Sequence, residues 1–152
     1  MKGGYCLVLS LNLAASIELK NTIFSLQPGT YIYCGSALIS LDARLERHIR
    51  NFKGGTIKRF WHIDHLLPAS ERLSVVKAAS TANVECRLVS LLAKRGLQPI
   101  RGFGSSDCRC GCKGHLLYSE GSFSEATQKA VASFMELGLA PEVLDVVPSR
   151  PL

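Results

Sequence analysis

The sequence has no long hydrophobic run, and its apolar stretches all fall short of the ~20 residues that a membrane-spanning helix needs. It also lacks the continuous apolar core and small-residue cleavage site of a signal peptide, because Ser and Asn interrupt residues 7–13. We therefore expect a cytoplasmic protein that has no membrane partner. In that compartment we expect its six cysteines to be reduced thiols.

Internal repeats, linkers and low-complexity segments are also missing, which argues against a multidomain chain. The 152 residues are 47% hydrophobic and 20% charged, which is enough apolar material for one packed core. We expect residues 1–152 to form a single α+β domain, with a small antiparallel or mixed sheet flanked by helices. A proline-containing tail from about residue 139 is expected to be extended.

Residue patterns predict the strands and helices. Alternating apolar residues indicate a strand over residues 4–13, and a weaker pattern indicates a second strand within 15–24. Stretches of β-branched, aromatic or other apolar residues indicate further strands at 30–33, 73–79 and 116–118. The first three strands would form an antiparallel meander. Apolar periodicity predicts helices over 41–51 and 82–95, a short helix before Pro68, and a final helix after Ser122.

Capping residues mark the ends of these elements. Ser40 would cap the helix over 41–51, and Ser122 with Glu125 forms a capping-box pattern for the final helix. Either Thr81 or Asn83 would cap the helix over 82–95, which Gly96 would end. Gly35-Ser36 would end the strand that contains Tyr33, because glycine favours a tight turn.

The strand that contains Tyr31 and Tyr33 leads directly into a basic amphipathic helix. On that helix Arg44 and His48 are four residues apart, so they lie on the same side, next to a buried stripe. Tyr5, on the first strand, is another candidate. A phenol, a fixed positive charge and a proton acceptor could together contact one phosphate group.

Basic residues are concentrated in the segment 44–59. The net charge is +6, and in this segment six basic residues face the single acidic residue Glu46. A cluster of this kind indicates a polyanionic partner such as nucleic acid, although a solvated basic surface is the alternative. The candidate contacts other than Arg44 are Arg47, Arg50, Lys53, Lys58 and Arg59.

Glu85 is the most informative carboxylate. Helical spacing places it on the same face as the apolar residues Leu88 and Leu92. A carboxylate that faces a core needs a partner or a metal ion. Glu85 is therefore either a functional ligand or one half of a salt bridge.

A second candidate metal site lies in the loop over 105–115. Its potential zinc ligands are Cys108, Cys110, Cys112 and His115. The C-x-C-x-C spacing differs from the paired C-x₂-C spacing of ordinary zinc knuckles, which argues against zinc. His62, Asp64 and His65 could add ligands, but such residues on an amphipathic segment are more often hydrogen-bonded.

Several motifs together resemble a known family. Gly3-Gly4-Tyr5 and Tyr33-Cys34-Gly35 resemble the two triads of GIY-YIG nucleases, with Gly4 and Cys34 in place of the central isoleucines. More closely, the chain resembles a little-characterised prokaryotic branch related to these nucleases, sometimes fused to endonuclease III. The supporting segments are Gly3-Gly4-Tyr5, 31–37, 44–48, 61–64, Glu85-Cys86, 102–108 and 115–118.

The resemblance implies a metal-dependent endonuclease, a phosphodiesterase acting on DNA. Glu85 would hold one Mg²⁺ or Mn²⁺ ion, and Arg44 would neutralise charge on the phosphate. Tyr5 or Tyr33 would orient or deprotonate the attacking water, helped by His48. A phenol titrates near ~10, so a catalytic base would need Arg44 to lower its pKa.

Two other interpretations remain open at this point. The chain could be a non-catalytic nucleic-acid-binding module on the same scaffold, or the 105–115 loop could form a zinc-stabilised interaction surface. The resemblance to domains fused to a repair enzyme also implies a role in DNA repair, with a repair protein as partner.

Overall fold

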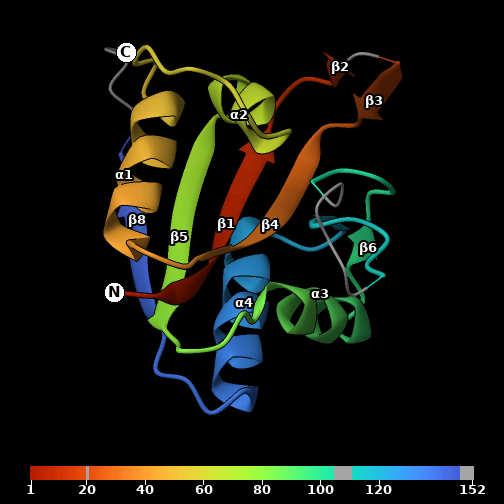
Figure 1. Ribbon diagram of the computed structural model, residues 1–152. Coiled ribbons are helices and arrows are strands. Elements are labelled where there is room, and N and C mark those ends of the chain that lie inside the picture. The colour runs from red at the N-terminus through yellow and green to blue at the C-terminus, as the bar shows by residue number, and fades with distance from the viewer. Residues whose placement is uncertain (20, 105–110, 148–152) are drawn as a thin grey trace.

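The computed structural model describes residues 1–19, 21–104 and 111–147, and its centre is a six-stranded antiparallel sheet (Figure 1). The strand order is β6-β7-β4-β1-β5-β8. The strands are β1 (Gly3–Leu11), β4 (Gly29–Ala37), β5 (Arg72–Ala79), β6 (Gln98–Pro99), β7 (Leu116–Ser119) and β8 (Glu142–Val146). The α+β fold class predicted from the sequence is confirmed.

Helices cover both faces of this sheet, because the central strands bury both of their faces. Tyr5 and Leu7 on β1 pack with α1 (Leu41–Phe52) and α2 (Ile63–Leu66), which a short 3₁₀ helix (Leu67–Ala69) follows. Cys6 and Val8 pack on the opposite side with α3 (Glu85–Lys94) and α4 (Phe123–Glu136). The domain therefore has three layers (Figure 1). In the described part of the chain, no helix has the length and apolar character needed to cross a bilayer.

The helix caps were predicted correctly in two of three cases. The Ser40 hydroxyl accepts a hydrogen bond from the Ala43 amide at 3.1 Å, and the Ser122 hydroxyl accepts one from Glu125 at 3.1 Å. Helix α3 differs, because it begins at Glu85 with Val84 at the N-cap position, and neither Thr81 nor Asn83 caps it. Val84 is buried, and no side chain caps the helix.

The segment between β1 and β4 forms a separate ribbon. Strands β2 (Ala15–Leu19) and β3 (Thr22–Leu26) pair only with each other in the described structure, and they extend beyond the main sheet (Figure 1). The predicted meander of three consecutive strands is wrong. Both edges of β1 are already occupied, by β4 and by β5.

The C-terminal segment is extended, but it is part of the sheet. Strand β8 pairs with β5, with Val146 opposite Leu73 and Glu142 opposite Lys77. This edge strand lies within the segment that the sequence predicts only as a tail.

Candidate active site

The pairing of β1 with β4 places Tyr5 directly opposite Gly35. A Cβ atom at Gly35 would overlap the phenol ring of Tyr5, so the absence of a side chain there makes room for that ring. The prediction that Gly35-Ser36 ends the strand is wrong, because β4 continues to Ala37. Gly35 is needed for a close contact between strands and not for a turn.

Tyr5 forms a buried pair with His48 from helix α1. The Tyr5 hydroxyl lies 2.9 Å from His48 Nε2, and the His48 side chain is inaccessible to solvent. Burial lowers the pKa of His48 to about 4, with a partly opposing effect from Asp64. Burial also raises the pKa of Tyr5 to about 12, although the positive charge of Arg44 opposes this shift. Both side chains are therefore neutral at neutral pH.

Tyr33 is the second phenol of the site. Burial raises its pKa well above its usual range, and the nearby Tyr5 and Glu85 act in the same direction. The sequence argument required Arg44 to lower a phenol pKa for base catalysis. For both tyrosines desolvation outweighs the effect of Arg44, so the pKa of each phenol is raised and not lowered. These phenols are suited to donating hydrogen bonds rather than to accepting a proton.

Arg44 is held in place by the end of β4 and by an aromatic ring. Its guanidinium donates a hydrogen bond to the Ser36 carbonyl at 3.2 Å and lies 4.4 Å from the centre of the Trp61 ring. Sequence reasoning gave Trp61 no role of its own in the site. Its stacking with Arg44 gives it a specific role, since a cation is favoured over an indole face.

Glu85 enters the site from the opposite layer of the domain. It is the first residue of α3 and is half-buried. The helix begins at Glu85 and not at residue 82 as predicted, so the Glu85 carboxylate lies at its N-terminal end. A negative charge is favourable there, next to the unpaired amides of the first turn.

These side chains surround two adjoining cavities. The smaller, of about 150 Å³, is lined by Tyr5, Tyr33, Gly35, Ser36, Arg44, Trp61, Glu85, Gly104 and His115. The larger, of about 540 Å³, is lined by residues 36–40, Ala43, Arg44, Arg47, Asn83 and Glu85. Because Ser36, Arg44 and Glu85 line both, the two cavities form one groove with the phenols at its inner end.

His48 lines neither cavity. It contacts the site through the Tyr5 hydroxyl, so its effect on bound substrate would be indirect.

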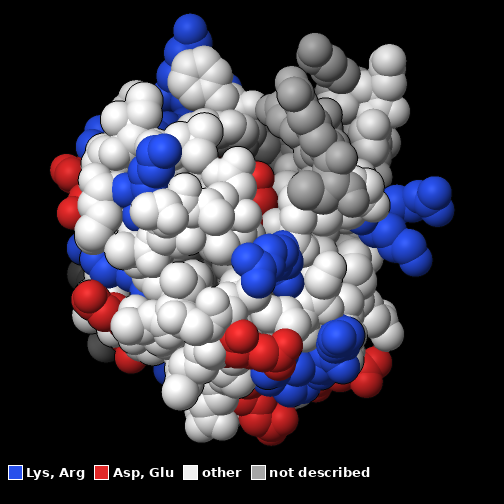
Figure 2. Space-filling model, turned by 60° about the horizontal axis from the view of Figure 1, so that its bottom comes forward, with Lys and Arg blue, Asp and Glu red and all other residues white. Residues whose placement is uncertain are grey.

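The basic segment divides into one structural arginine and several exposed side chains. Arg47 forms two hydrogen bonds with the buried carboxylate of Asp64, at 2.7 and 2.9 Å, and a third with the Lys58 carbonyl at 2.6 Å. The other predicted contacts, Arg50, Lys53, Lys58 and Arg59, are exposed. Figure 2 shows one face of the molecule, where lysines and arginines form several separate groups with acidic side chains between some of them.

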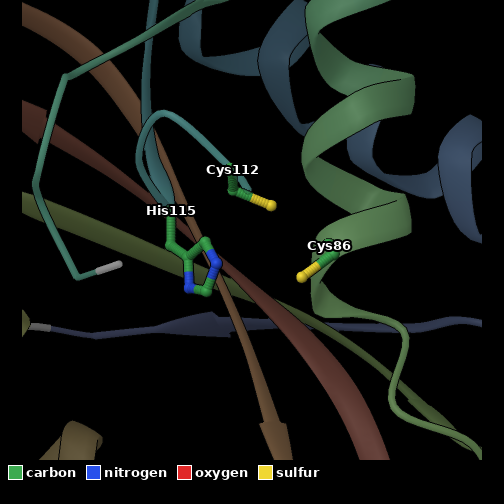
Figure 3. Close-up of side chains that lie close together, drawn as sticks. All are labelled: Cys86, Cys112 and His115. Atoms are coloured by element: carbon green, nitrogen blue, oxygen red, sulfur yellow. The ribbon is translucent and has the colours of Figure 1, made fainter. Parts of the chain in front are cut away.

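The predicted zinc ligands are only partly described. Cys108 and Cys110 lie outside the described residues. Cys112 and His115 lie close to Cys86 from α3, and the potential ligand atoms of the three residues are all within 4.8 Å of one another (Figure 3). Sequence reasoning did not connect Cys86 with this loop.

Two of the other residues considered for metal binding, His62 and Asp64, have other partners. His62 Nδ1 accepts a hydrogen bond from the Gly104 amide at 2.8 Å, and Arg47 and two backbone amides donate to the Asp64 carboxylate. Burial opposes ionisation of Asp64, but these hydrogen bonds lower its pKa overall.

A family model described as domain of unknown function DUF123 matches residues 4–136, which contain every residue of the groove. The chain belongs to the DUF123 family. No curated protein and no solved structure matches the chain.

In this DUF123 domain the position of Glu85 depends on a glycine in β1. A Cβ atom at Gly4 would overlap a methyl group of Val84, the residue that precedes Glu85. Strand β1 and the start of α3 are therefore in contact because Gly4 has no side chain.

Replacing Gly4 with Ala should destabilise the DUF123 domain by ~1–3 kcal/mol, the usual cost of overpacking. The Val84→Ala substitution removes the methyl group that an alanine at position 4 would overlap. The double variant Gly4→Ala/Val84→Ala should therefore lose less stability than the two single variants together, by about 1 kcal/mol or more. Urea denaturation of the four proteins in this cycle measures the coupling. The pair Gly4→Ala/Val89→Ala, on the same helix, is the control and should be close to additive.

Proposed function

We propose that this protein is a divalent-metal-dependent nuclease that cleaves DNA. The observation that carries the proposal is the convergence of two phenols, a guanidinium and a carboxylate on one groove. Tyr5 and Tyr33 come from the sheet, Arg44 from α1 and Glu85 from α3. Four separate elements, two strands and two helices, supply the groups that phosphodiester cleavage requires.

Arg44 is suited to contact the scissile phosphate. Its guanidinium is oriented by the Ser36 carbonyl and by Trp61, so little conformational entropy is lost when it binds an anion. A preorganised positive charge stabilises the charge that develops on phosphate oxygens in the transition state.

Tyr5 is suited to orient a water molecule or a phosphate oxygen. His48 Nδ1 is buried and has no hydrogen-bond partner among the described residues. An unpaired buried N–H group costs more than an unpaired lone pair, which favours the tautomer with the proton on Nε2. In that tautomer His48 Nε2 donates its hydrogen bond to the Tyr5 oxygen. The Tyr5 hydroxyl can then donate its own proton to a group in the cavity.

Glu85 is the carboxylate in the groove that fits a divalent cation. Mg²⁺ and Mn²⁺ are commonly held by one or two carboxylates, with water and substrate phosphate completing the coordination. When bound, such an ion would supply positive charge for the leaving oxygen. The chain's own residues would bind the phosphate through Arg44 and orient water through Tyr5 or Tyr33.

The exposed basic residues after Arg44 support DNA as the substrate. Arg50, Lys53, Lys58 and Arg59 are exposed, so their charges lie at the surface where a phosphate backbone would bind. Arg47 differs, because it is bound to the buried carboxylate of Asp64. The chain also resembles domains that are fused to endonuclease III. On that basis we extend the proposal to a role in DNA repair, with a DNA-repair protein as partner.

One observation favours the rival function of a non-catalytic DNA-binding module. Tyr5 is only 1% exposed, and a residue so deeply buried can serve the fold alone. Such a module would bind DNA with an affinity that falls steeply with salt, but it would not cleave DNA in Mg²⁺ or Mn²⁺.

Labelled branched, flapped and single-stranded DNA, incubated with Mg²⁺ or Mn²⁺, separates the two functions. We expect metal-dependent cleavage by the wild type and a loss of ~10²–10³-fold in the Arg44→Ala variant. Lys94→Ala is the control and should cleave DNA like the wild type, since Lys94 is an exposed cation on α3 that lines neither cavity. Salt-sensitive binding without cleavage by the wild type would contradict the nuclease proposal and support the binding module.

A further inference from the structure

We propose that Cys86, Cys112 and His115 form a zinc site that adjoins the nuclease groove, whose smaller cavity His115 also lines. Their potential ligand atoms are all within 4.8 Å of one another. In a tetrahedral zinc site, Zn–S bonds of ~2.3 Å and Zn–N bonds of ~2.0 Å place ligand atoms roughly 3.3–3.8 Å apart. Shifts of about 1 Å would therefore bring the three residues to binding distance.

His115 provides independent support for a bound ion. Only 5% of the His115 surface is exposed. Its Nε2 atom has no hydrogen-bond partner within the described part of the chain. A buried nitrogen without a partner costs ~1–3 kcal/mol. Figure 3 shows the imidazole pointing toward the two sulfur atoms, so a metal ion between them would satisfy this nitrogen.

The backbone around His115 is fixed before any ion binds. The His115 amide donates a hydrogen bond to the Phe103 carbonyl at 2.8 Å, and the His115 carbonyl accepts one from Cys34 at 2.9 Å. Gly114, the residue before it, packs so closely on the Ile100 carbonyl that a Cβ atom there would overlap it. This rigid segment presents Cys112 and His115 on the same side, which lowers the entropic cost of binding.

Cys86 supplies the third ligand from another layer of the fold. It lies in the first turn of α3, where the unpaired backbone amides favour a thiolate, the form that binds metals. Cys86 and Cys112 are both half-buried, which leaves a route for an ion to enter. The site would connect the start of α3 to the segment that leads into β7.

The donor set distinguishes this site from the groove. Two thiolates and one imidazole select zinc, whereas Mg²⁺ and Mn²⁺ prefer oxygen ligands such as Glu85. Glu85 and Cys86 are consecutive, so a zinc ion at Cys86 would hold the helix turn that also carries Glu85. The proposed role is structural and is independent of whether the groove cleaves DNA.

Metal analysis of protein purified without a chelator tests the site directly. We expect about one zinc ion per chain. After zinc is removed under reducing conditions, Co²⁺ should restore thiolate-to-cobalt charge-transfer bands and the ligand-field spectrum of a tetrahedral ion. The Cys86→Ser and Cys112→Ser variants should bind zinc more than ~100-fold less tightly than the wild type. A loss of this size exceeds the one expected when a mutation removes only a residue that supports a metal ligand.

Two variants control for folding and for the identity of the site. Cys6→Ala removes a buried thiol that lies 3.9 Å from Cys34, and it should keep the full zinc content. Glu85→Gln should also keep it, and loss of zinc in that variant would contradict the site. Zinc removal from the wild type should lower the thermal midpoint reversibly, which tests the site without any mutation.

Three results would overturn the proposal. The first is reduced wild-type protein that binds neither zinc nor Co²⁺ stoichiometrically. The second is an unchanged cobalt spectrum in Cys86→Ser, which would mean that other residues hold the ion. The third is a Cys86–Cys112 disulfide, detected by mass spectrometry, in protein that was kept under reducing conditions.

Discussion

Replacing Glu85 with Gln should reduce metal-dependent DNA cleavage by on the order of 10²–10³-fold, because the substitution removes the carboxylate charge and keeps the size of the side chain. Cleavage is measured on the preferred labelled DNA at saturating Mg²⁺ and Mn²⁺. DNA binding in the absence of divalent ions should be retained, since the basic residues of α1 and the following loop are unchanged.

The fold of the Glu85→Gln protein must be checked separately. The carboxylate also interacts favourably with the N-terminus of α3, so its loss should cost up to about 1 kcal/mol of stability. Glu142→Gln, on edge strand β8, is the matched control and should cleave DNA like the wild type. Unimpaired cleavage by a well-folded Glu85→Gln protein would show that Glu85 is not the metal ligand.

The stability of the domain should fall by about 3 kcal/mol as the pH is lowered from 6.5 to about 4. Burial lowers the pKa of His48 to about 4 in the folded state, from an ordinary value of 6.5. Between these values the unfolded chain binds a proton that the folded chain does not. Protonation therefore favours unfolding in this range, and above pH 6.5 the effect is absent.

Urea denaturation at a series of pH values measures this dependence. The His48→Gln variant should show a flatter profile, because glutamine keeps a hydrogen-bonding group toward Tyr5 and does not titrate. The pKa of His62 is lowered in the same direction, but His62 is less buried, so His62→Gln should flatten the profile less. Asp64 contributes only at lower pH, because its pKa is lowered from an ordinary value of 3.8. An unchanged profile in His48→Gln would contradict the role given to His48.

Local sequence signals predicted the regular parts of this fold. Ser40 and Ser122 cap their helices as expected, and Gly96 ends α3 with a φ of +95°. Each of these features depends on contacts within a few residues along the chain. For that reason a single sequence is sufficient to find them.

Features that depend on distant contacts were missed. Val84, the residue before α3, packs closely against Gly4 on β1, and neither residue carries a capping signal. Gly35 is a typical turn residue, yet its position in β4 is determined by the Tyr5 ring on the neighbouring strand. In both cases packing across the sheet overrides the local preference.

The two arginines of α1 illustrate the same limit for the site. Arg44 and Arg47 are one turn apart and both lie over the Trp61 ring, at 4.4 and 4.6 Å. Arg47 is neutralised by the buried carboxylate of Asp64, and Arg44 lines the groove beside the phenols. The partner of each arginine comes from a later part of the chain, which helical spacing does not reveal.

The position of β8 has a consequence for the synthesis of this protein. Strand β5 pairs with β1 on one side and with β8 on the other. Within the described residues, its second edge is covered by β8, which lies near the end of the described chain. A nascent chain that has emerged only as far as α4 therefore presents an open edge with Val75 and Val76 beside it. Such an edge is a template for aggregation. Residues 142–146 close this edge of the sheet, so truncation before β8 would remove this protection.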